Sequence, residues 1–407
     1  MAVLRLKSKT FNTPHKHKQG DRLQVKIEKI VPNGYGLSFA DGMTVFTALA
    51  ASGDELIVEI RQLKHNTAFA EIVEVITPSS DRIEPPCVYF GACGGCDFQQ
   101  LNYQAQLEAK VAIIKDSLTR IGKIENYPEI EIVRSPEEFG YRLRAQWHVN
   151  SREKKIGYYR RNSHDVVDIE RCLVLAPELE FTLEETRKTL DWDTIWNEKT
   201  QIDAALGNNG LVSMFSPEAS QTAPLVSYSA SDFTYFYSAQ SFFQGNRFLV
   251  DKLINLATAG ASGENALDLY SGVGLFTLPL ARHFKKAIGI EDNGQAVDLA
   301  KKNAETAGLD NVDFVRKTVR HYLNEKLPEN IDFLLLDPPR AGAENDTIQN
   351  ILKIGARQIS YVSCEPSILA RDLRKFLEGG YRINSITALD LFPQTHHVET
   401  VVRLSKE

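Results

Sequence analysis

The stretch "ENALDLYSGVGLFTLPLA", residues 264–281, combines a short apolar run, a glycine turn and a second apolar run with helical spacing. Ala266, Leu267 and Leu269 predict a buried strand. Gly272 and Gly274 predict a turn where the backbone can approach a ligand closely. A strand, a glycine turn and a helix in this order are typical of the first unit of a doubly wound parallel sheet. The stretch therefore predicts an α/β fold with a ligand site at the turn.

Four more strand-like segments follow, separated by helix-like segments. They are "KAIGIE" (286–291), "VDFVRK" (312–317), "IDFLLLD" (331–337) and "QISYVSC" (358–364). Alternation of strands and helices predicts a parallel sheet covered by helices. We predict a Rossmann-like domain over residues 231–407.

The acids near the glycine turn indicate which ligand it holds. A dinucleotide site would have a third glycine at position 277, where Thr277 stands. Glu291 ends the second strand about twenty residues on, where an acid binds ribose hydroxyls. Losing the pyrophosphate glycine but keeping the ribose acid favours S-adenosylmethionine over NAD. An ordinary turn beside a surface glutamate is the alternative.

Three reactive side chains follow other strands of the same sheet. "LLLDPPRAG" (334–342) places Asp337 at a strand end, where two prolines stiffen the loop before Arg340. Cys364 ends the next strand. A lone cysteine there is usually an inert buried thiol, but its place on the ligand edge favours a nucleophile. "LFPQTHHVETVVRL" (391–404) adds Glu399, and we interpret its two histidines as positional because no third metal ligand accompanies them.

The region before residue 231 predicts two smaller domains. Residues 21–77 read as five short strands with turn signals, which favours a closed β-barrel of OB type. "TPSSDRIEPP" (77–86) has the composition of a boundary. Residues 101–122 have helical spacing up to Gly122, and strand-like segments follow. We predict a barrel over 18–77 and a central α+β domain over 78–230.

Three of the five cysteines lie within "CVYFGACGGCDFQQ", residues 87–100. With the distant Cys172, the C-x5-C-x2-C spacing offers four soft ligands, which suit either tetrahedral zinc or a [4Fe–4S] cluster. The spacing alone leaves both open. Chance clustering of buried thiols is another alternative. No run of eighteen apolar residues and no secretory leader pattern is present, so we expect a cytoplasmic protein without membrane spans, where disulfides are rare.

Positive charge is concentrated in two places although the net charge is −6. Residues 1–30 carry eight Lys/Arg against two acids, which fits a solvated face and a binding arm equally well. Residues 142–161 carry seven against one, interleaved with aromatic residues. Cations combined with stacking surfaces predict binding of single-stranded RNA. The aromatic residues are Tyr141, Trp147, Tyr158 and Tyr159.

Five segments together resemble the RNA (uracil-5-)-methyltransferase family in the family's order, and the resemblance covers nearly the whole chain. They are "QSFFQGN" (240–246), "DLYSGVG" (268–274), "DPPRAG" (337–342), "SCEPSILARDL" (363–373) and "HHVETV" (396–401). The resemblance implies that residues 18–77 form a TRAM domain. It also implies S-adenosylmethionine bound by Gln244, Tyr270, Glu291 and Asp337.

The same resemblance implies the chemistry. Cys364 is the nucleophile that adds to C6 of a uracil, and Glu399 is the general base that removes the C5 proton. Asp337 and Arg340 would orient the base or the enolate. The cysteines hold a [4Fe–4S] cluster in a subset of the family, which assigns it to Cys87, Cys93, Cys96 and Cys172. The implied substrate is 23S rRNA ahead of the T-loop of tRNA, and no obligate protein partner is implied.

Two departures and two rival interpretations accompany this expectation. Glu365 stands where the family usually has Asn, and Leu275 where some members have Asn. A non-catalytic RNA-binding protein would share the basic segment and the cysteines but would not need Cys364 and Glu399. A radical enzyme would cleave S-adenosylmethionine at its cluster, but the usual cysteine spacing there is three then two, against five then two here.

Overall fold

The computed structural model describes residues 17–218, 223–325 and 327–406. The basic N-terminal arm considered above therefore lies largely outside the described residues. The chain divides into two compact units, residues 1–82 and 83–407. Each is described by itself below.

The first unit is one six-stranded sheet with the strand order β1-β5-β6-β4-β3-β2. Only β4 and β6 pair in parallel. We expected five strands, but the segment 22–31 is divided: β1 pairs with β5, whereas β2 pairs with β3. The strands are β1 (Arg22–Lys26), β2 (Lys29–Val31), β3 (Tyr35–Ala40), β4 (Met43–Thr47), β5 (Glu55–Lys64) and β6 (Thr67–Thr77), with a 3-10 turn η1 (Pro32–Gly34).

Side-chain alternation builds the core of this unit. Leu23 and Val25 of β1 are buried between exposed neighbours, as the period-two pattern predicts. In β6 the small residues Ala68 and Ala70 face the core, while Phe69 lies on the opposite face and stacks on Phe46 with ring centroids 5.5 Å apart. The OB-type assignment stays a prediction.

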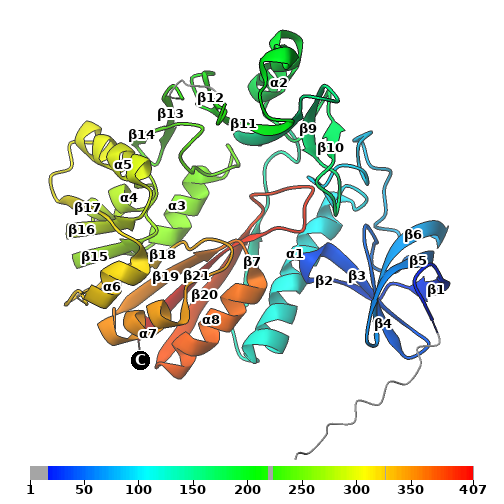
Figure 1. Ribbon diagram of the computed structural model, residues 1–407. Coiled ribbons are helices and arrows are strands. Elements are labelled where there is room, and N and C mark those ends of the chain that lie inside the picture. Colours follow the sequence, from blue (N-terminus) through cyan, green and yellow to red (C-terminus); the bar gives the residue numbers. More distant parts are fainter. Residues whose placement is uncertain (1–16, 219–222, 326, 407) are drawn as a thin grey trace, which may run out of the picture. The chain divides into compact units, whose positions relative to one another are not determined.

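The second unit contains the predicted Rossmann-like sheet (Figure 1). Its strand order is β17-β16-β15-β18-β19-β21-β20-β7, with β15 to β19 all parallel and β21 antiparallel to both neighbours. The order reverses at β15, which is the ligand-binding switch point of such sheets. The strands are β7 (Ile130–Val133), β15 (Gly263–Leu269), β16 (Phe284–Glu291), β17 (Val312–Arg316), β18 (Phe333–Leu336), β19 (Gln358–Ser363), β20 (Tyr381–Leu389) and β21 (Glu399–Lys406).

Helices cover both faces of this sheet, because alternate strand residues are buried on opposite sides. Leu335 points to one side with α3, α4 and α5, whereas Leu334 and Leu336 point to the other with α1, α6, α7 and α8. The helices are α1 (Tyr103–Ser117), α3 (Val250–Thr258), α4 (Thr277–Ala281), α5 (Gly294–Thr306), α6 (Val319–Glu325), α7 (Asn345–Ile354) and α8 (Pro366–Glu378). One π turn, η2 (Leu118–Gly122), extends α1 to the predicted end at Gly122.

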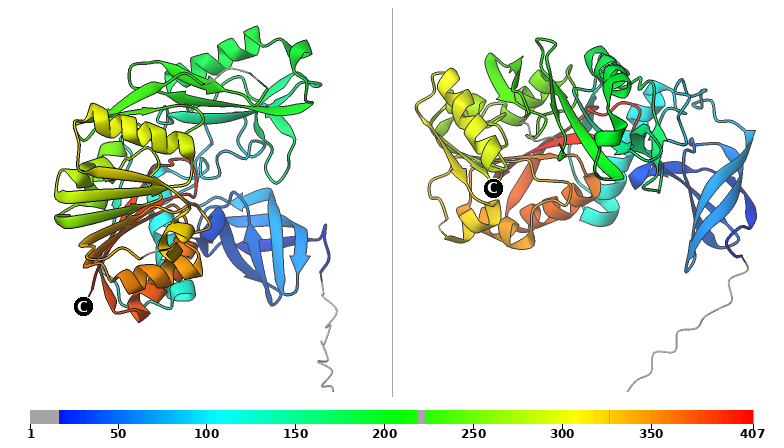
Figure 2. Two further views of the ribbon diagram at one scale, coloured as in Figure 1. Left: turned by 60° about the vertical axis from the view of Figure 1, so that its left-hand side comes forward. Right: turned by 45° about the horizontal axis from the view of Figure 1, so that its top comes forward.

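The remaining strands form a five-stranded antiparallel sheet and a hairpin, seen in green in Figure 2. Their cores are continuous with the α3–α5 side of the large sheet, so residues 83–407 are one compact unit. No helix in the described part of the chain is long and apolar enough to cross a membrane. The elements are β8 (Arg144–Asn150), β9 (Lys155–Tyr159), β10 (Val166–Asp168), α2 (Pro177–Thr189), η3 (Trp192–Thr194), β11 (Lys199–Leu206), β12 (Val212–Phe215), β13 (Val226–Ala230) and β14 (Phe233–Tyr237).

Candidate functional site

Three predicted catalytic side chains meet at one edge of the large sheet. Asp337 follows the carboxyl end of β18 and Cys364 follows that of β19. Glu399 begins β21, and the antiparallel pairing of Ser363 with Thr400 brings that beginning to the same edge. The pairing of these strands thus brings one thiol and two carboxyl groups to the same sheet edge, although Asp337 and Glu399 are 62 residues apart in the chain.

Cys364 is a protonated thiol in the free protein. Burial is the main cause that raises its pKa to about 12, and Glu399 and Asp337 contribute in the same direction. The guanidinium of Arg340 opposes both effects. A thiol in this setting needs a nearby positive charge and a proton acceptor before it can act as a nucleophile. The site provides one of each type.

Glu399 is the most strongly perturbed acid of the site. Its side chain is 4% exposed, and Oε1 has no hydrogen-bond partner among the described residues. Burial raises its pKa well above the usual range, with a contribution from Asp337. Asp337 itself has a pKa raised to about 7 by burial. A buried carboxyl group with a free oxygen is suited to accept a proton from a bound substrate.

Glu291 ends β16, as the sequence predicted, and its carboxylate accepts hydrogen bonds from the glycine turn. The N–H of Gly272 donates to Glu291 Oε2 at 2.9 Å, and the N–H groups of Asp292 and Asn293 donate to Oε1. A Cβ on Gly274 would lie 2.6 Å from Leu278 Cδ1 and its φ is +89°, so only glycine fits there. Tyr270 also has a positive φ of 67°, a strained conformation that is common at ligand sites.

Two polar groups at this turn were missed by the sequence reasoning. Asp268 is 1% exposed; Oδ2 accepts from Thr277 Oγ1 at 2.5 Å, and Oδ1 has no partner among the described residues. Burial raises its pKa to about 8. Ser271 Oγ is likewise buried and unpaired. The signal was available, since an acid within the apolar run "ALDL" next to a glycine turn must have a reason to be buried.

Gln244 lies in the loop between β14 and α3 and is 3% exposed. The adjacent Gly245 lies close to Phe392, which belongs to the loop before Glu399. A Cβ placed on Gly245 would be 3.6 Å from Cε1 of the Phe392 ring. The predicted cofactor residues therefore fall into two described groups: Tyr270 and Glu291 at the glycine turn, and Gln244 beside the loop that precedes β21.

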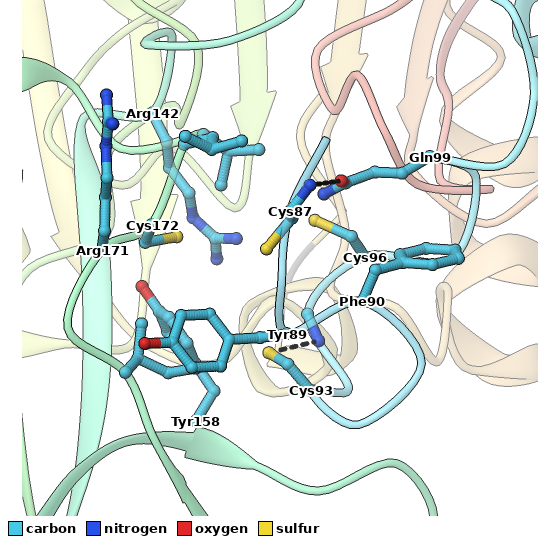
Figure 3. A pocket seen from close by; sticks show the side chains of 14 residues that line it. Cys87, Tyr89, Phe90, Cys93, Cys96, Gln99, Arg142, Tyr158, Arg171 and Cys172 are labelled. Carbon is cyan, nitrogen blue, oxygen red and sulfur yellow. Dashed lines mark hydrogen bonds between the residues drawn. The ribbon is translucent and has the colours of Figure 1, made fainter. Parts of the chain in front are cut away.

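The four predicted ligand cysteines line one cavity. Figure 3 shows the sulfur atoms of Cys87, Cys93, Cys96 and Cys172 facing a common space, into which the guanidinium of Arg142 also extends. All are free thiols. The backbone turns tightly here, because a Cβ on Gly94 would lie 3.1 Å from the carbonyl oxygen of Tyr159.

Burial makes these thiols poor anions unless positive charge compensates them. Burial raises the pKa of Cys93 to about 11 and that of Cys96 to about 12. In Cys96, Gln99 and Arg142 oppose this increase in pKa. Among the described residues, no carboxylate forms an ion pair with Arg142, and no three His, Cys, Asp or Glu side chains converge closely enough for a single metal ion. Four cysteine thiols around one cavity are a donor set that either a zinc ion or a [4Fe–4S] cluster can use.

The basic segment 142–161 differs from the prediction. Trp147 and Tyr141 are fully buried core residues, and Tyr158 lines the cysteine cavity. The guanidinium of Arg144 donates to backbone carbonyl oxygens of residues 238, 239 and 241. The prediction of RNA contact was therefore wrong for the buried Tyr141 and Trp147 and for Arg144, because charge and aromaticity along a strand do not reveal which face is buried. The exposed cations are Arg152, Lys154 and Arg160.

Both departures from the family pattern have structural roles. The Glu365 side chain caps α8 by accepting from Ser367 N and Ser367 Oγ. Leu275 is buried, and its carbonyl oxygen accepts from Tyr235 OH at 3.1 Å. Neither side chain adds or removes a reactive group at the sheet edge.

Comparisons of the sequence and fold with known proteins identify related RNA methyltransferases. An RNA methyltransferase of Synechocystis, itself uncharacterized, is 32% identical over 98% of both chains. The chain belongs to the RNA (uracil-5-)-methyltransferase family. The family described as tRNA (uracil-5-)-methyltransferase matches residues 223–407 of this methyltransferase.

Two further relatives of this methyltransferase have named substrates. A protein of Pectobacterium atrosepticum named 23S rRNA (uracil(1939)-C(5))-methyltransferase is 29% identical over 96% of this chain and 95% of its own. The crystal structure of the Pyrococcus abyssi tRNA (uracil-54, C5)-methyltransferase in complex with S-adenosyl-L-homocysteine aligns with a TM-score of 0.72 at 26% identity. That alignment covers 94% of this chain and all of the other.

Proposed function

We propose that this protein transfers the methyl group of S-adenosylmethionine to C5 of a specific uridine in RNA, through a covalent adduct with Cys364. The observation that carries the proposal is the meeting of Cys364, Asp337 and Glu399 at the sheet edge beside Arg340. Family membership supports the reaction, and the adduct and residue roles rest on this arrangement of groups.

The proposed reaction needs one nucleophile and one base. The Cys364 thiolate forms a bond to C6 of the uracil, and the electron pair of the C5–C6 double bond moves to give an enolate. C5 then forms a bond to the methyl carbon of the sulfonium. The sulfur–methyl bond breaks, and S-adenosylhomocysteine leaves. Glu399 removes the C5 proton, the double bond re-forms and the C6–sulfur bond breaks. Arg340 lowers the pKa of both Cys364 and Glu399, which favours the ionised forms that the reaction requires.

Substitution of the two catalytic residues separates their roles. Cys364→Ala should abolish methyl transfer and all covalent complex. Glu399→Gln should still add and methylate but should not release the product, so it should accumulate a methylated RNA–protein adduct that survives denaturing electrophoresis. Glu365→Gln is the matched control, since Glu365 adjoins Cys364 but caps a helix. Normal turnover by Glu399→Gln would give the base role to another acid, with Asp337 next to test.

The cofactor site follows from the glycine turn. We assign Glu291 to the ribose hydroxyls, with Tyr270, Asp337 and Gln244 completing the site. Support comes from the Gly272–Glu291 hydrogen bond and from the unpaired oxygen of Asp268, a residue that we add to the set. Calorimetry with S-adenosylhomocysteine tests the assignment, since Glu291→Gln should weaken binding by about tenfold or more.

The proposed substrate is 23S rRNA. The relative named for that substrate matches almost the full length of both chains, whereas the T-loop uridine of tRNA is the second candidate because of the Pyrococcus abyssi neighbour. Mass spectrometry of both RNAs from a deletion strain distinguishes them. Loss of 5-methyluridine from one RNA alone identifies the substrate, and unchanged modification of both would favour a non-catalytic RNA-binding protein.

We assign the four-cysteine cavity to a [4Fe–4S] cluster held by Cys87, Cys93, Cys96 and Cys172. The methyl transfer requires no electron transfer, so such a cluster would supply cross-links between the loop 87–96 and the segment at residue 172. Protein purified without oxygen should be brown and contain iron and acid-labile sulfide. Stoichiometric zinc without iron would overturn the assignment.

The three-part division of the chain is part of the same proposal. Residues 18–77 would be an RNA-binding TRAM domain, residues 78–230 the cluster and RNA-binding region, and residues 231–407 the methyltransferase domain. The six-stranded sheet of β1–β6 supports the first of these boundaries.

A further inference from the structure

The loop of residues 390–398 connects β20 to β21 and leads directly into Glu399. Its His397 contacts the active site, because His397 Nε2 lies 3.5 Å from a terminal nitrogen of Arg340. Arg340 in turn acts on Cys364 and Glu399. This contact links the loop to the cation that lowers the pKa of both Cys364 and Glu399.

The first half of the loop is anchored by α1. The buried Lys110 donates to Asp390 Oδ1 and to the carbonyl oxygen of Phe392, and Tyr103 OH donates to Asp390 Oδ2 at 2.8 Å. Gln106 and Gln394 exchange two hydrogen bonds of 3.0 Å. These groups are all buried, so this half of the loop belongs to the rigid core.

The second half is held from the cysteine loop. The carboxylate of Asp97 accepts from the backbone N–H of His396 at 2.8 Å and pairs with His396 Nδ1. The backbone N–H groups of Asp97 and Phe98 donate to the Gln394 carbonyl oxygen at 3.1 and 3.0 Å. Among the described residues, the polar partner of His396 outside its own loop is Asp97, which directly follows Cys96.

We propose that Asp97 is a positioning residue that couples the four-cysteine site to the catalytic loop. When the thiols hold their metal centre, the backbone at Cys96 is fixed, and Asp97 fixes His396 and thereby the His397–Arg340 contact. When the centre is lost, the Asp97 side chain leaves His396 and residues 395–398 of the loop become mobile, while the α1 anchors and the backbone hydrogen bonds from Asp97 and Phe98 to Gln394 hold the rest. The inference rests on the proposed function of both sites.

Hydrogen exchange of full-length protein tests the coupling without reference to activity. Removal of the centre from the wild type with a chelator and an oxidant should increase exchange at residues 395–399 but not at 390–393. Asp97→Ala should show the same increase while still loaded, and removing the centre from Asp97→Ala should add little. The exposed Asp310→Ala serves as control. Unchanged exchange at 395–399 in Asp97→Ala would overturn the proposal.

Kinetics provide the second arm. Asp97→Ala and His396→Ala should each lower kcat about tenfold with unchanged affinity for S-adenosylhomocysteine and RNA, and the double variant should be no worse than either. Asp97→Asn, which can still accept from the His396 N–H, should recover most of the rate. Additive losses would overturn the coupling. If the wild type transfers no methyl group to any RNA, the proposed function fails, and the exchange experiment still decides the coupling.

Discussion

Arg340 is the side chain on which the ionisation of the catalytic site depends. Burial raises the pKa of both Cys364 and Glu399, so the reactive ionised form of each group increases as the pH rises. We therefore expect kcat/KM to increase from pH 6 to pH 9. The positive charge of Arg340 stabilises the ionised forms of Cys364 and Glu399 most strongly where water is excluded.

Arg340→Met should shift that pH profile to higher pH and lower the rate at pH 7.5 about a hundredfold. The physical reason is that both pKa values rise further without the guanidinium. Arg340→Lys keeps the charge and should lose less. Methyl-transfer rates across the pH range measure this, and a Met variant with an unshifted profile would assign Arg340 a role other than charge.

Asp268 is a second group whose protonation affects the whole protein. Its pKa is about 8 when folded, against about 4 in an unfolded chain. Between these values the unfolded chain is ionised and the folded protein is not, so stability falls as the pH rises from about 4 to 8, by up to roughly 5 kcal/mol. Protein without cofactor should therefore melt at a lower temperature at pH 8 than at pH 5.

Asp268→Asn should remove this dependence while keeping an acceptor for Thr277 Oγ1. We expect the variant to melt above the wild type at pH 8 and to approach it at pH 5. Melting curves by circular dichroism provide the measurement. A wild type and variant with parallel curves across this range would show that Asp268 is ionised in the folded protein.

Cys364 and Asp337 could be located from the sequence because each directly follows a strand. Cys364 and Asp337 end apolar runs, so their position on a common edge follows from the parallel order alone. Asp97 could not be found this way, because its partner His396 lies 299 residues away. The burial of Trp147 was also inaccessible, since a strand pattern does not say which of its faces meets a second sheet.

At the scale of elements, β8, β9 and their connecting turn form the remaining candidate for RNA contact. Replacing Arg152, Lys154 and Arg160 with Gln should weaken RNA binding and flatten its salt dependence, because each lost phosphate contact removes counterion release. Affinity for S-adenosylhomocysteine should not change. Filter-binding titrations at several salt concentrations measure both quantities.

A matched control replaces three exposed cations elsewhere: Lys285, Lys301 and Arg374. Equal losses in both triple variants would mean that only net charge matters, and the β8–β9 turn would then be an ordinary solvated surface. Arg142 and Arg144 are not substituted in either variant. Arg142 lines the cysteine cavity, and Arg144 donates hydrogen bonds to backbone carbonyl oxygens.

At the scale of the whole molecule, the two compact units should be separable. Residues 83–407 contain both large cores and all the proposed catalytic residues. We expect the fragment 83–407 to fold and to bind S-adenosylhomocysteine with the affinity of the full chain, but to bind RNA more weakly. Calorimetry and RNA titration of the fragment test this, and an insoluble fragment would show that the first unit is needed for folding.

The position of β21 has a consequence for protein synthesis. This strand lies between β19 and β20, and it carries Glu399. Both neighbours leave the ribosome before it, so the growing chain holds a gap in the middle of its sheet until β21 emerges. Until that moment Glu399, the base that we propose, is missing from the side of Cys364. A nascent chain, even one translated next to abundant ribosomal RNA, can therefore bind nucleotides through its earlier segments but cannot complete a catalytic cycle.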